Sequence, residues 1–302
     1  MFDRLTIVGL GLIGSSLARA AKSYGLAKCV VAYDRDTAVR ARVKELGISD
    51  WIADDIGTAV QDSDFVIVCV PVGATASVAR AMSDHLKPGA IISDVGSVKS
   101  AVYEAFLENL PQHVHIVPAH PVAGTEYSGP DAGFATLFRD RWCIVTPPSD
   151  ASPDVVEKVR AFWAACGANV ELMSAQHHDL VLAITSHVPH LIAYNIVGTA
   201  ADLEEVTQSE VIKFSAGGFR DFTRIAASDP TMWRDIFLNN KDAVLEMLGR
   251  FNEDLLALQR MIRWGDGQGL FDLFTRTRAI RRSIIEQGQE TSAPNFGREK
   301  TP

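Results

Sequence analysis

The chain has 302 residues and a net charge of −8, with a pI of about 5.5. This length allows two domains, and 47% hydrophobic residues with a mean hydropathy of +0.07 can form a sizeable core. The acidic balance argues against nucleic acid as a main partner, because phosphate backbones bind basic surfaces, whereas a small anionic substrate needs only one or two local cations.

The cysteines and the amino terminus indicate a cytoplasmic protein. Four cysteines lie among apolar neighbours without a C-x-x-C pair, so we expect reduced, buried thiols at Cys29, Cys69, Cys143 and Cys166. Residue 1 leads directly into a strand-like segment, with no charged leader and apolar signal core. No apolar run approaches the roughly 20 residues of a membrane span, so we expect no membrane partner.

A glycine-rich turn follows the first predicted strand, residues 5–8. It reads Gly9-Leu10-Gly11-Leu12-Ile13-Gly14, and residues 15–23 then continue as a helix. In a strand–turn–helix context this G-x-G-x-x-G pattern indicates dinucleotide binding. Gly9 permits the tight turn, Gly11 lets the backbone approach a pyrophosphate, and Gly14 lets helix and strand pack closely. The first helical turn, with Leu12 and Ile13, would offer free N–H groups to the phosphates.

The second predicted strand, residues 29–33, ends at Asp34. An acidic residue about 20 positions beyond the glycines holds the 2′-hydroxyl of the adenosine ribose and repels a 2′-phosphate, so we expect NAD rather than NADP. Arg35 leaves NADP open, because its guanidinium could accept the phosphate. Asp34 could alternatively cap a helix that begins at Thr37.

The strand–helix rhythm continues to residue 172 and predicts a Rossmann-type, doubly wound, mostly parallel sheet over residues 1–172. Residues 65–70 are a buried strand, with Val70 and Pro71 at the cofactor edge. Residues 89–93 form the next strand and lead to Ser97, which is either a helix N-cap or a site residue. Two later strands, 141–146 and 168–172, flank a helix over 153–166.

His120 follows a strand over residues 114–117 and lies between Pro118 and Pro121. Each proline fixes its own φ and restricts the residue before it, so the backbone here should be rigid and extended. Doubly wound sheets bind ligands beyond the carboxyl ends of their strands, which would place Ser97 and His120 at one edge. We interpret His120 as the base of a nicotinamide-dependent dehydrogenase; alternatively it satisfies a turn.

The β pattern stops at Ser174, and residues 173–287 form a predicted helical domain. Residues 175–201 are helical, with a kink at Pro189. His187 and His190 share a face, about two turns beyond a cluster that could bind metal, His177, His178 and Asp179. Their spacing is not that of a known zinc motif, so we expect hydrogen-bonded histidines without a metal, with His190 a donor facing the cofactor cleft.

A second dense stretch spans residues 214–233. Gly217-Gly218 should break the helix, and Arg220, Asp221 and Arg224 then form either an exposed turn or an arginine fork for a carboxylate. Ser228-Asp229-Pro230 marks a helix start.

One helix is predicted from Pro230 to about Trp264, on the order of 50 Å long. Its apolar residues alternate at spacings of four and three: Val244, Leu248, Phe251, Leu255, Leu258 and Ile262. The seam favours a homodimer over a long core helix within one chain. A last helix covers 270–285, and the polar tail over 288–302 should be disordered.

Five motifs occur here in the order found in prephenate and arogenate dehydrogenases, and the chain resembles this family over nearly its whole length. They are residues 9–14, 94–99, 120–126, 186–190 and 221–226. The resemblance implies oxidative decarboxylation of prephenate or arogenate with hydride transfer to NAD, in tyrosine biosynthesis, and an all-helical dimerisation domain.

The resemblance also assigns roles. His120 would accept the proton of the substrate hydroxyl, Ser97 would bind the same hydroxyl, and Arg224 would bind a carboxylate. Four residues would line or close the pocket around the side chain: His190, Asp221, Glu126 and Trp233.

The sequence leaves two alternative functions to consider. A β-hydroxyacid dehydrogenase is disfavoured because that class looks to use a lysine on the interdomain helix, and no lysine lies between Lys158 and Lys213. A non-catalytic NAD-binding sensor would lack a proton acceptor such as His120. No residue decides between prephenate and arogenate.

Overall fold

The computed structural model describes residues 1–125, 127–207 and 216–286. Contacts divide the chain into two compact units, residues 1–247 and residues 248–302. The division at residue 172 stays a prediction. The residues of the candidate functional site that lie in these ranges belong to the first unit.

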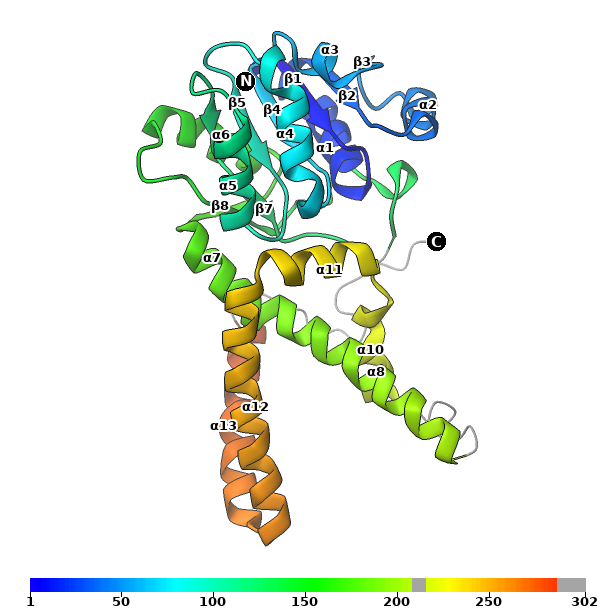
Figure 1. Cartoon of the computed structure of the whole chain (residues 1–302), viewed down its shortest axis with the longest axis vertical. Coiled ribbons are helices and arrows are strands. Elements are labelled where there is room, and N and C mark those ends of the chain that lie inside the picture. Colours follow the sequence, from blue (N-terminus) through cyan, green and yellow to red (C-terminus); the bar gives the residue numbers. More distant parts are fainter. Residues whose placement is uncertain (126, 208–215, 287–302) are drawn as a thin grey trace. The chain divides into compact units, whose positions relative to one another are not determined.

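A six-stranded parallel sheet organises the first unit, in the order β3-β2-β1-β4-β5-β6 (Figure 1). Its strands are β1 (Phe2–Val8), β2 (Ala27–Tyr33), β3 (Trp51–Ile52), β4 (Phe65–Val68), β5 (Ile91–Asp94) and β6 (His115–Ile116). This order is that of a doubly wound dinucleotide fold, whose ligand edge lies at the carboxyl ends of the strands. The predicted Rossmann-type sheet is therefore confirmed.

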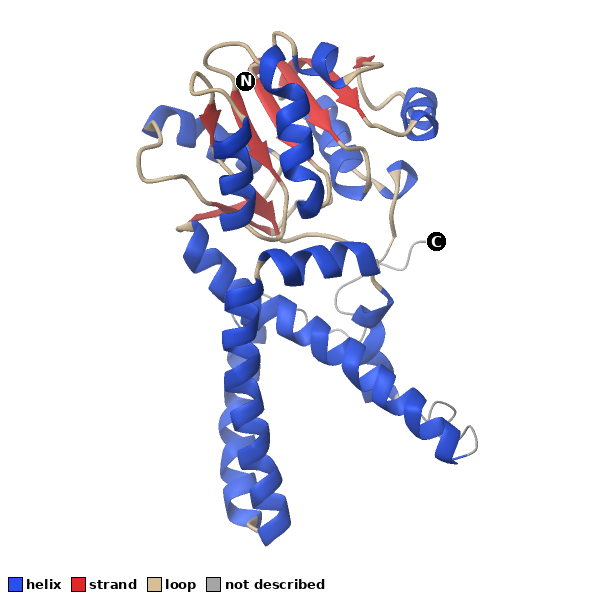
Figure 2. Ribbon diagram, in the orientation of Figure 1, coloured by secondary structure: helices blue, strands red, loops and turns tan. Residues whose placement is uncertain are grey.

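Helices cover both faces of this sheet, and each face has its own apolar core (Figure 2). The elements are α1 (Leu12–Ser23), α2 (Thr37–Leu46), α3 (Ile56–Val60), η1 (Val72–Ala74), α4 (Thr75–Met82), η2 (Ser83–His85) and α5 (Ser100–Asn109). On one face Phe65 packs on Phe2 and Phe162, with ring centroids 4.9 and 5.2 Å apart. β4 is fully buried because both of its faces are covered.

The next three strands form a separate sheet. They are β7 (Ala119–Pro121), β8 (Trp142–Val145) and β9 (Asn169–Leu172), with η3 (Pro130–Ala132) before β8 and α6 (Pro153–Ala165) between β8 and β9. β7 pairs antiparallel with β8, and β8 pairs parallel with β9. His120 itself lies in a short strand, β7, opposite Ile144, and not in a loop beyond the strand over 114–117. The flanking prolines restrict the backbone to the extended region, as expected, and that region also suits a short strand.

The predicted interruption near Pro189 is a π-helical turn. It comprises η4 (Ala183–His187), between α7 (Ala175–Leu182) and α8 (Val188–Thr207). Pro189 has no N–H to continue the α-helical ladder, and its ring crowds the carbonyl four residues earlier, so the wider turn relieves the conflict.

The continuous helical stretch Ala175–Leu203 is long and apolar enough to cross a membrane by length and composition, with a hydropathy of 1.5. The expectation that no segment approaches this length is therefore wrong. The same stretch carries three fully or almost fully buried polar side chains, on His178, Asp179 and His187. These groups are hydrogen-bonded within the first unit, and this placement is typical of a site-forming helix in a globular protein.

The long helix predicted from Pro230 is two helices. α11 (Pro230–Asn239) begins as expected, with the Asp229 carboxylate accepting a hydrogen bond from the Met232 N–H at 2.8 Å. It ends at Asn240, whose buried side chain bonds elsewhere, and α12 (Lys241–Trp264) follows. Upstream, α10 (Gly217–Thr223) begins at Gly217-Gly218, and η5 (Arg224–Ala227) continues from it.

The second unit contains the distal part of α12 and all of α13 (Gly267–Glu286), joined at Gly265 with a φ of 70°. A left-handed glycine is the usual way to end a helix. The last predicted helix is confirmed, and the tail over 288–302 lies outside the described residues. Large apolar side chains are exposed on this hairpin, including Leu255, Ile262, Trp264, Phe271 and Phe274. Of the distal seam residues, Leu255 and Ile262 are thus exposed in a single chain, whereas Leu248, Phe251 and Leu258 are partly buried.

Candidate active site

The glycine turn has the geometry predicted for each glycine. Gly9 has a φ of 95°, and a Cβ there would lie 2.7 Å from the carbonyl oxygen of Cys69. A Cβ on Gly14 would lie 1.9 Å from the carbonyl oxygen of Gly9, so only glycine permits this approach of helix and turn. Gly11 faces open space, with no atom within 4 Å of its Cβ position. A pyrophosphate could therefore approach the backbone at Gly11.

The start of α1 is open as an anion site. Its N-cap, Gly11, has no side chain to satisfy the first N–H groups, and Leu12 and Ile13 occupy the first turn. Val70 lies beside the turn, with its Cγ1 3.0 Å from the Cβ position of Gly9, and Pro71 directly precedes η1 as its N-cap. These residues meet because β1 and β4 are adjacent and end at the same edge.

Asp34 lies at the same turn. Its Oδ2 accepts a hydrogen bond from the Leu10 N–H at 2.8 Å, and its Oδ1 accepts one from the Asp36 N–H at 2.9 Å. The cap of α2 is Asp36, which accepts from the Ala38 N–H, so the alternative reading of Asp34 as the N-cap is wrong. Arg35 is exposed. The Asp34 carboxylate is thus held beside the glycines, where a ribose hydroxyl would be expected.

A buried hydrogen-bonded chain extends from His120 into α7. The His120 Nδ1 lies 2.8 Å from the His178 Nε2, and the His178 Nδ1 lies 2.9 Å from the Asp179 Oδ1. Asp179 also accepts hydrogen bonds from the N–H groups of Lys99 (2.7 Å) and Ser100 (2.9 Å). Asp179 therefore joins the start of α5 to α7, and no sequence motif indicated this connection.

The charges in this chain of contacts fix the protons. Burial alone would raise the pKa of Asp179, but hydrogen bonds from His178, Lys99 and Ser100 hold this pKa below its usual value. An ionised Asp179 accepts a hydrogen bond from the His178 Nδ1–H, so the Nε2 of the neutral His178 ring must itself be an acceptor. The His120 Nδ1 then carries a hydrogen, which leaves the His120 Nε2 with a free lone pair.

His120 is held neutral by its surroundings. Only 7% of the residue is exposed. Burial lowers the pKa of its ring well below the ordinary 6.5, and the neighbouring His178, Lys99 and His187 lower it further. A neutral imidazole with one defined lone pair is the form that a general base requires near neutral pH.

A second buried group fixes the backbone of β7. The Lys99 ammonium contacts the Asp94 carboxylate and donates to the Ala119 carbonyl oxygen at 2.7 Å, and the Ala119 N–H donates to Asp94 at 3.2 Å. The Gly96 N–H donates to the same carboxylate at 2.7 Å. Asp94 and Lys99 are 2% and 0% exposed, so this pair lies in the protein interior.

The π-turn and α11 form the neighbouring wall. Asn240 donates to the Asp179 carbonyl oxygen at 2.8 Å and contacts the His187 Nδ1 at 3.1 Å, and burial lowers the pKa of His187 to about 4. The His190 ring stacks on Trp233 with centroids 3.7 Å apart, and Trp233 packs with Val98, the neighbour of Ser97. Trp233 thus links the β5–α5 turn to α8.

The structure brings several predicted residues to this wall. Ser97 lies half-buried in the turn before α5, and the N-cap reading is wrong because that helix begins at Ser100 with Lys99 as its cap. Burial lowers the pKa of His190, and the Arg224 guanidinium lowers it further, so Arg224 lies within electrostatic reach of His190. Arg224 and Asp221 are exposed. Glu126 lies outside the described residues.

Sequence reasoning missed five residues of the site: Asp94, Lys99, His178 as a partner of His120, Asp179 and Asn240. Asp94 and Lys99 are the ends of one of the five motifs. His178 and Asp179 belong to the cluster considered for metal binding, and hydrogen-bonded histidines were expected there, but no link from His178 to His120 was predicted. In the described part of the chain, no three His, Cys, Asp or Glu side chains are arranged to hold a metal ion.

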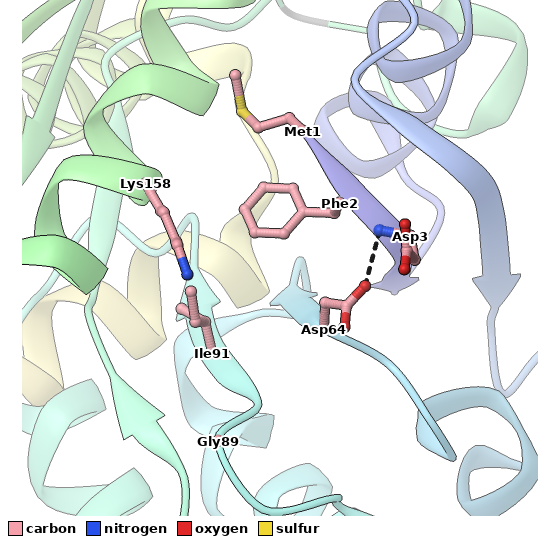
Figure 3. Close-up of a pocket in the computed structure, with 7 residues that line it drawn as sticks. All are labelled: Met1, Phe2, Asp3, Asp64, Gly89, Ile91 and Lys158. Carbon is pink, nitrogen blue, oxygen red and sulfur yellow. Dashed lines mark hydrogen bonds between the residues drawn. The ribbon is translucent and has the colours of Figure 1, made fainter.

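One pocket lies elsewhere. It has a volume of about 270 Å³ and opens beside Phe2, Asp64 and Lys158, at the amino-terminal edge of the sheet (Figure 3). Asp64 there accepts a hydrogen bond from the Asp3 N–H. Because doubly wound sheets bind ligands at the opposite edge, this pocket is separate from the His120 site.

Comparison with known proteins gives consistent results. Residues 17–172 match the family model described as prephenate dehydrogenase, nucleotide-binding domain, and residues 174–276 match prephenate dehydrogenase, dimerization domain. The chain is 45% identical to a cyclohexadienyl dehydrogenase of Zymomonas mobilis, over 94% of this chain and 97% of that one. It is 32% identical to a prephenate dehydrogenase of Bacillus subtilis, over 98% and 80% of the two chains.

A solved structure is similar over almost the whole chain. The prephenate dehydrogenase of A. aeolicus, in complex with hydroxyphenyl propionate and NAD⁺, superimposes with a TM-score of 0.88. It is 31% identical in sequence, and the match covers 94% of this chain and 99% of that one.

Proposed function

The chain belongs to the prephenate dehydrogenase family and is an NAD-dependent dehydrogenase of prephenate, arogenate or both, and we propose that His120 is the base of its reaction. The observation that carries this proposal is the ordered contact from Asp179 through His178 to His120. It leaves the His120 Nε2 as the acceptor in a buried, neutral ring. The family match argues against the two alternative functions, a non-catalytic NAD-binding sensor and a β-hydroxyacid dehydrogenase.

The base acts on the substrate hydroxyl. The His120 Nε2 accepts the hydroxyl proton while the carbon that bears the hydroxyl loses a hydride, for which bound NAD would be the acceptor. The carbon–oxygen bond thereby becomes a double bond, and the ring of His120 becomes an imidazolium. The His178 Nε2 accepts the hydrogen bond from the His120 Nδ1, and the Asp179 carboxylate stabilises the positive charge through His178. Loss of the ring carboxylate as carbon dioxide then makes the product aromatic, which drives the reaction forward.

Other residues orient the substrate. The Ser97 hydroxyl, in the turn before α5, binds the reacting hydroxyl and aligns it with His120. The Arg224 guanidinium binds a substrate carboxylate through charge-assisted hydrogen bonds. Around the side chain, His190 and Trp233 form the stacked wall, and Asp221 would close the pocket.

The residues present fit a dinucleotide. The open Gly11 backbone, Gly9, Gly14 and the first turn of α1 with Leu12 and Ile13 would hold the pyrophosphate of NAD, with Val70 and Pro71 alongside. Asp34 would bind the ribose, and its negative charge disfavours the 2′-phosphate of NADP, with Arg35 the residue that could weaken this preference. When bound, NAD supplies the hydride acceptor.

The decisive experiment compares kcat/KM for prephenate and arogenate, each with NAD and with NADP, by the absorbance of the reduced nicotinamide. We expect turnover of at least one substrate and a preference for NAD. No turnover of either substrate with either cofactor would refute the proposed function.

We also propose that the enzyme is a cytoplasmic homodimer. The exposed apolar side chains of the α12–α13 hairpin support this, because soluble monomers rarely expose so many along one element, and the matched family domain is described as a dimerization domain. Sedimentation analysis would show twice the chain mass of 32.8 kDa, and a monomer at micromolar concentration would contradict it.

A further inference from the structure

Lys99 contacts both ends of the His120 site. Its backbone N–H donates to Asp179, the carboxylate that fixes the histidine protons, at 2.7 Å. Its side-chain ammonium donates to the carbonyl of Ala119, the residue before the base, also at 2.7 Å. Lys99, Asp179, His178, His120 and Ala119 therefore form a closed ring of bonded contacts.

Asp94 completes the backbone clamp. Its carboxylate contacts the Lys99 ammonium and accepts from the Ala119 N–H, so the pair holds both backbone groups of Ala119. Asp94 ends β5 in the main sheet, whereas Ala119 begins β7 in the second sheet. The pair therefore fixes β7, and with it the base, relative to the cofactor edge.

Stability alone does not account for such a pair. Two charges removed from water carry a large desolvation cost, and well-packed apolar replacements of buried ion pairs are often neutral or stabilising. This pair is almost completely buried, and its bonds outside the pair are directed to the β5–α5 turn and to Ala119. This placement points to a positional role.

We propose that Lys99, with Asp94 as its partner, is a positioning residue that holds His120 in register with the substrate and keeps the base in its proton-accepting form. The proposal rests on the proposed function of His120. Lys99 acts through the backbone of Ala119 and through its own positive charge, and it does not touch the substrate.

Several ionisable groups face His120 and contribute to the charge around its ring. His178 and Asp179 approach from α7, His187 from the π-turn, Asp94 and Lys99 from the end of β5 and the turn after it, and Cys143 from β8. Of these, His178, Lys99 and His187 lower the pKa of His120, and Lys99 is the cation of the ion pair with Asp94. Its removal should therefore raise the pKa of His120.

The test uses two variants of the full-length enzyme. Lys99→Met removes the clamp and leaves Asp94 without its partner. Lys99→Met with Asp94→Asn removes both charges and retains an acceptor for the Ala119 N–H, which protects folding if the single variant is unstable. In the folded variants we expect kcat to fall roughly 10- to 100-fold, with the affinity for NAD unchanged, because a small displacement of the base is costly.

The pH profile separates positioning from a general structural effect. In Lys99→Met, the acid limb of kcat/KM should move to higher pH by about half a pH unit, because the pKa of His120 rises. It should move less in the double variant, whose net charge is the same as that of the wild type. Lys87→Met is the matched control, because Lys87 pairs with Asp64 at 2.6 Å at the amino-terminal edge of the sheet. It should change neither kcat nor the acid limb.

The outcomes are distinct. A folded double variant with kcat within threefold of the wild type and an unmoved acid limb in Lys99→Met would overturn the positioning role alone. If the wild type turns over neither substrate, the proposed function fails instead. Nitrogen NMR of the histidine rings then tests the inference independently, since Lys99→Met should raise the pKa of His120 and an unchanged pKa would overturn it.

Discussion

The Asp179 carboxylate can be tested by a change of one atom. Asp179→Asn keeps the size of the side chain but replaces an acceptor oxygen with an NH₂ group. In the wild type the two oxygens accept from the Lys99 N–H, the Ser100 N–H and the His178 Nδ1. The amide can face these three donors with only one oxygen, so one or more of them loses its acceptor.

The size of the effect follows from these contacts. A buried donor without an acceptor costs about 1–3 kcal/mol, so the free energy of unfolding should fall by this amount. If the NH₂ group faces His178, both histidines change tautomer and the His120 Nε2 carries a hydrogen, which removes a base contribution of roughly 10²- to 10⁴-fold. If the oxygen faces His178, the charge that stabilises the imidazolium is lost, and kcat falls about 10-fold. In both cases the affinity for NAD should be unchanged.

The assay is kcat with saturating substrate and NAD, together with thermal unfolding and NAD binding. Asp64→Asn is the matched control, because Asp64 also accepts from two backbone N–H groups and one side chain, those of Asp3, Arg4 and Lys87. It should lose stability but retain kcat. If Asp179→Asn folds and has kcat within threefold of the wild type, the proton order inferred for His120 is incorrect.

Three further outcomes are expected. His120→Asn should bind NAD normally and lose most turnover, measured as kcat; near-normal kcat would exclude His120 as the base. Arg224→Ala should raise KM roughly 30-fold, which corresponds to about 2 kcal/mol of binding free energy, because the charge-assisted contact with the substrate carboxylate is lost. An unchanged KM would show that the carboxylate binds elsewhere. Burial lowers the pKa of His120, and the base must be neutral, so kcat/KM should stay level as pH falls through 6.5 and decline only below it; a midpoint at or above 6.5 would contradict the buried, neutral ring.

The sequence alone determined the dinucleotide half of the molecule. The roles of Gly9, Gly11 and Gly14 depend on backbone conformation within a few consecutive residues, and a six-residue pattern between a strand and a helix is enough to specify them. The cap at Asp229 was predicted for the same reason, since a cap bonds to an N–H three residues away. The apolar strands also followed from local pattern, because strands covered on both faces are continuously hydrophobic.

The tertiary structure alone decided how the base is held. Lys99, Ala119, Asp179 and Asn240 come from four elements, and no periodicity in the chain relates them. The predicted long helix divides at Asn240 because the side chain of Asn240 bonds to His187 and Asp179, and His178 becomes a partner of His120 because α7 packs at the start of α5. Hydrogen bonds between residues 20 to 80 positions apart depend on the packing of whole elements, and local sequence patterns contain no information about that packing.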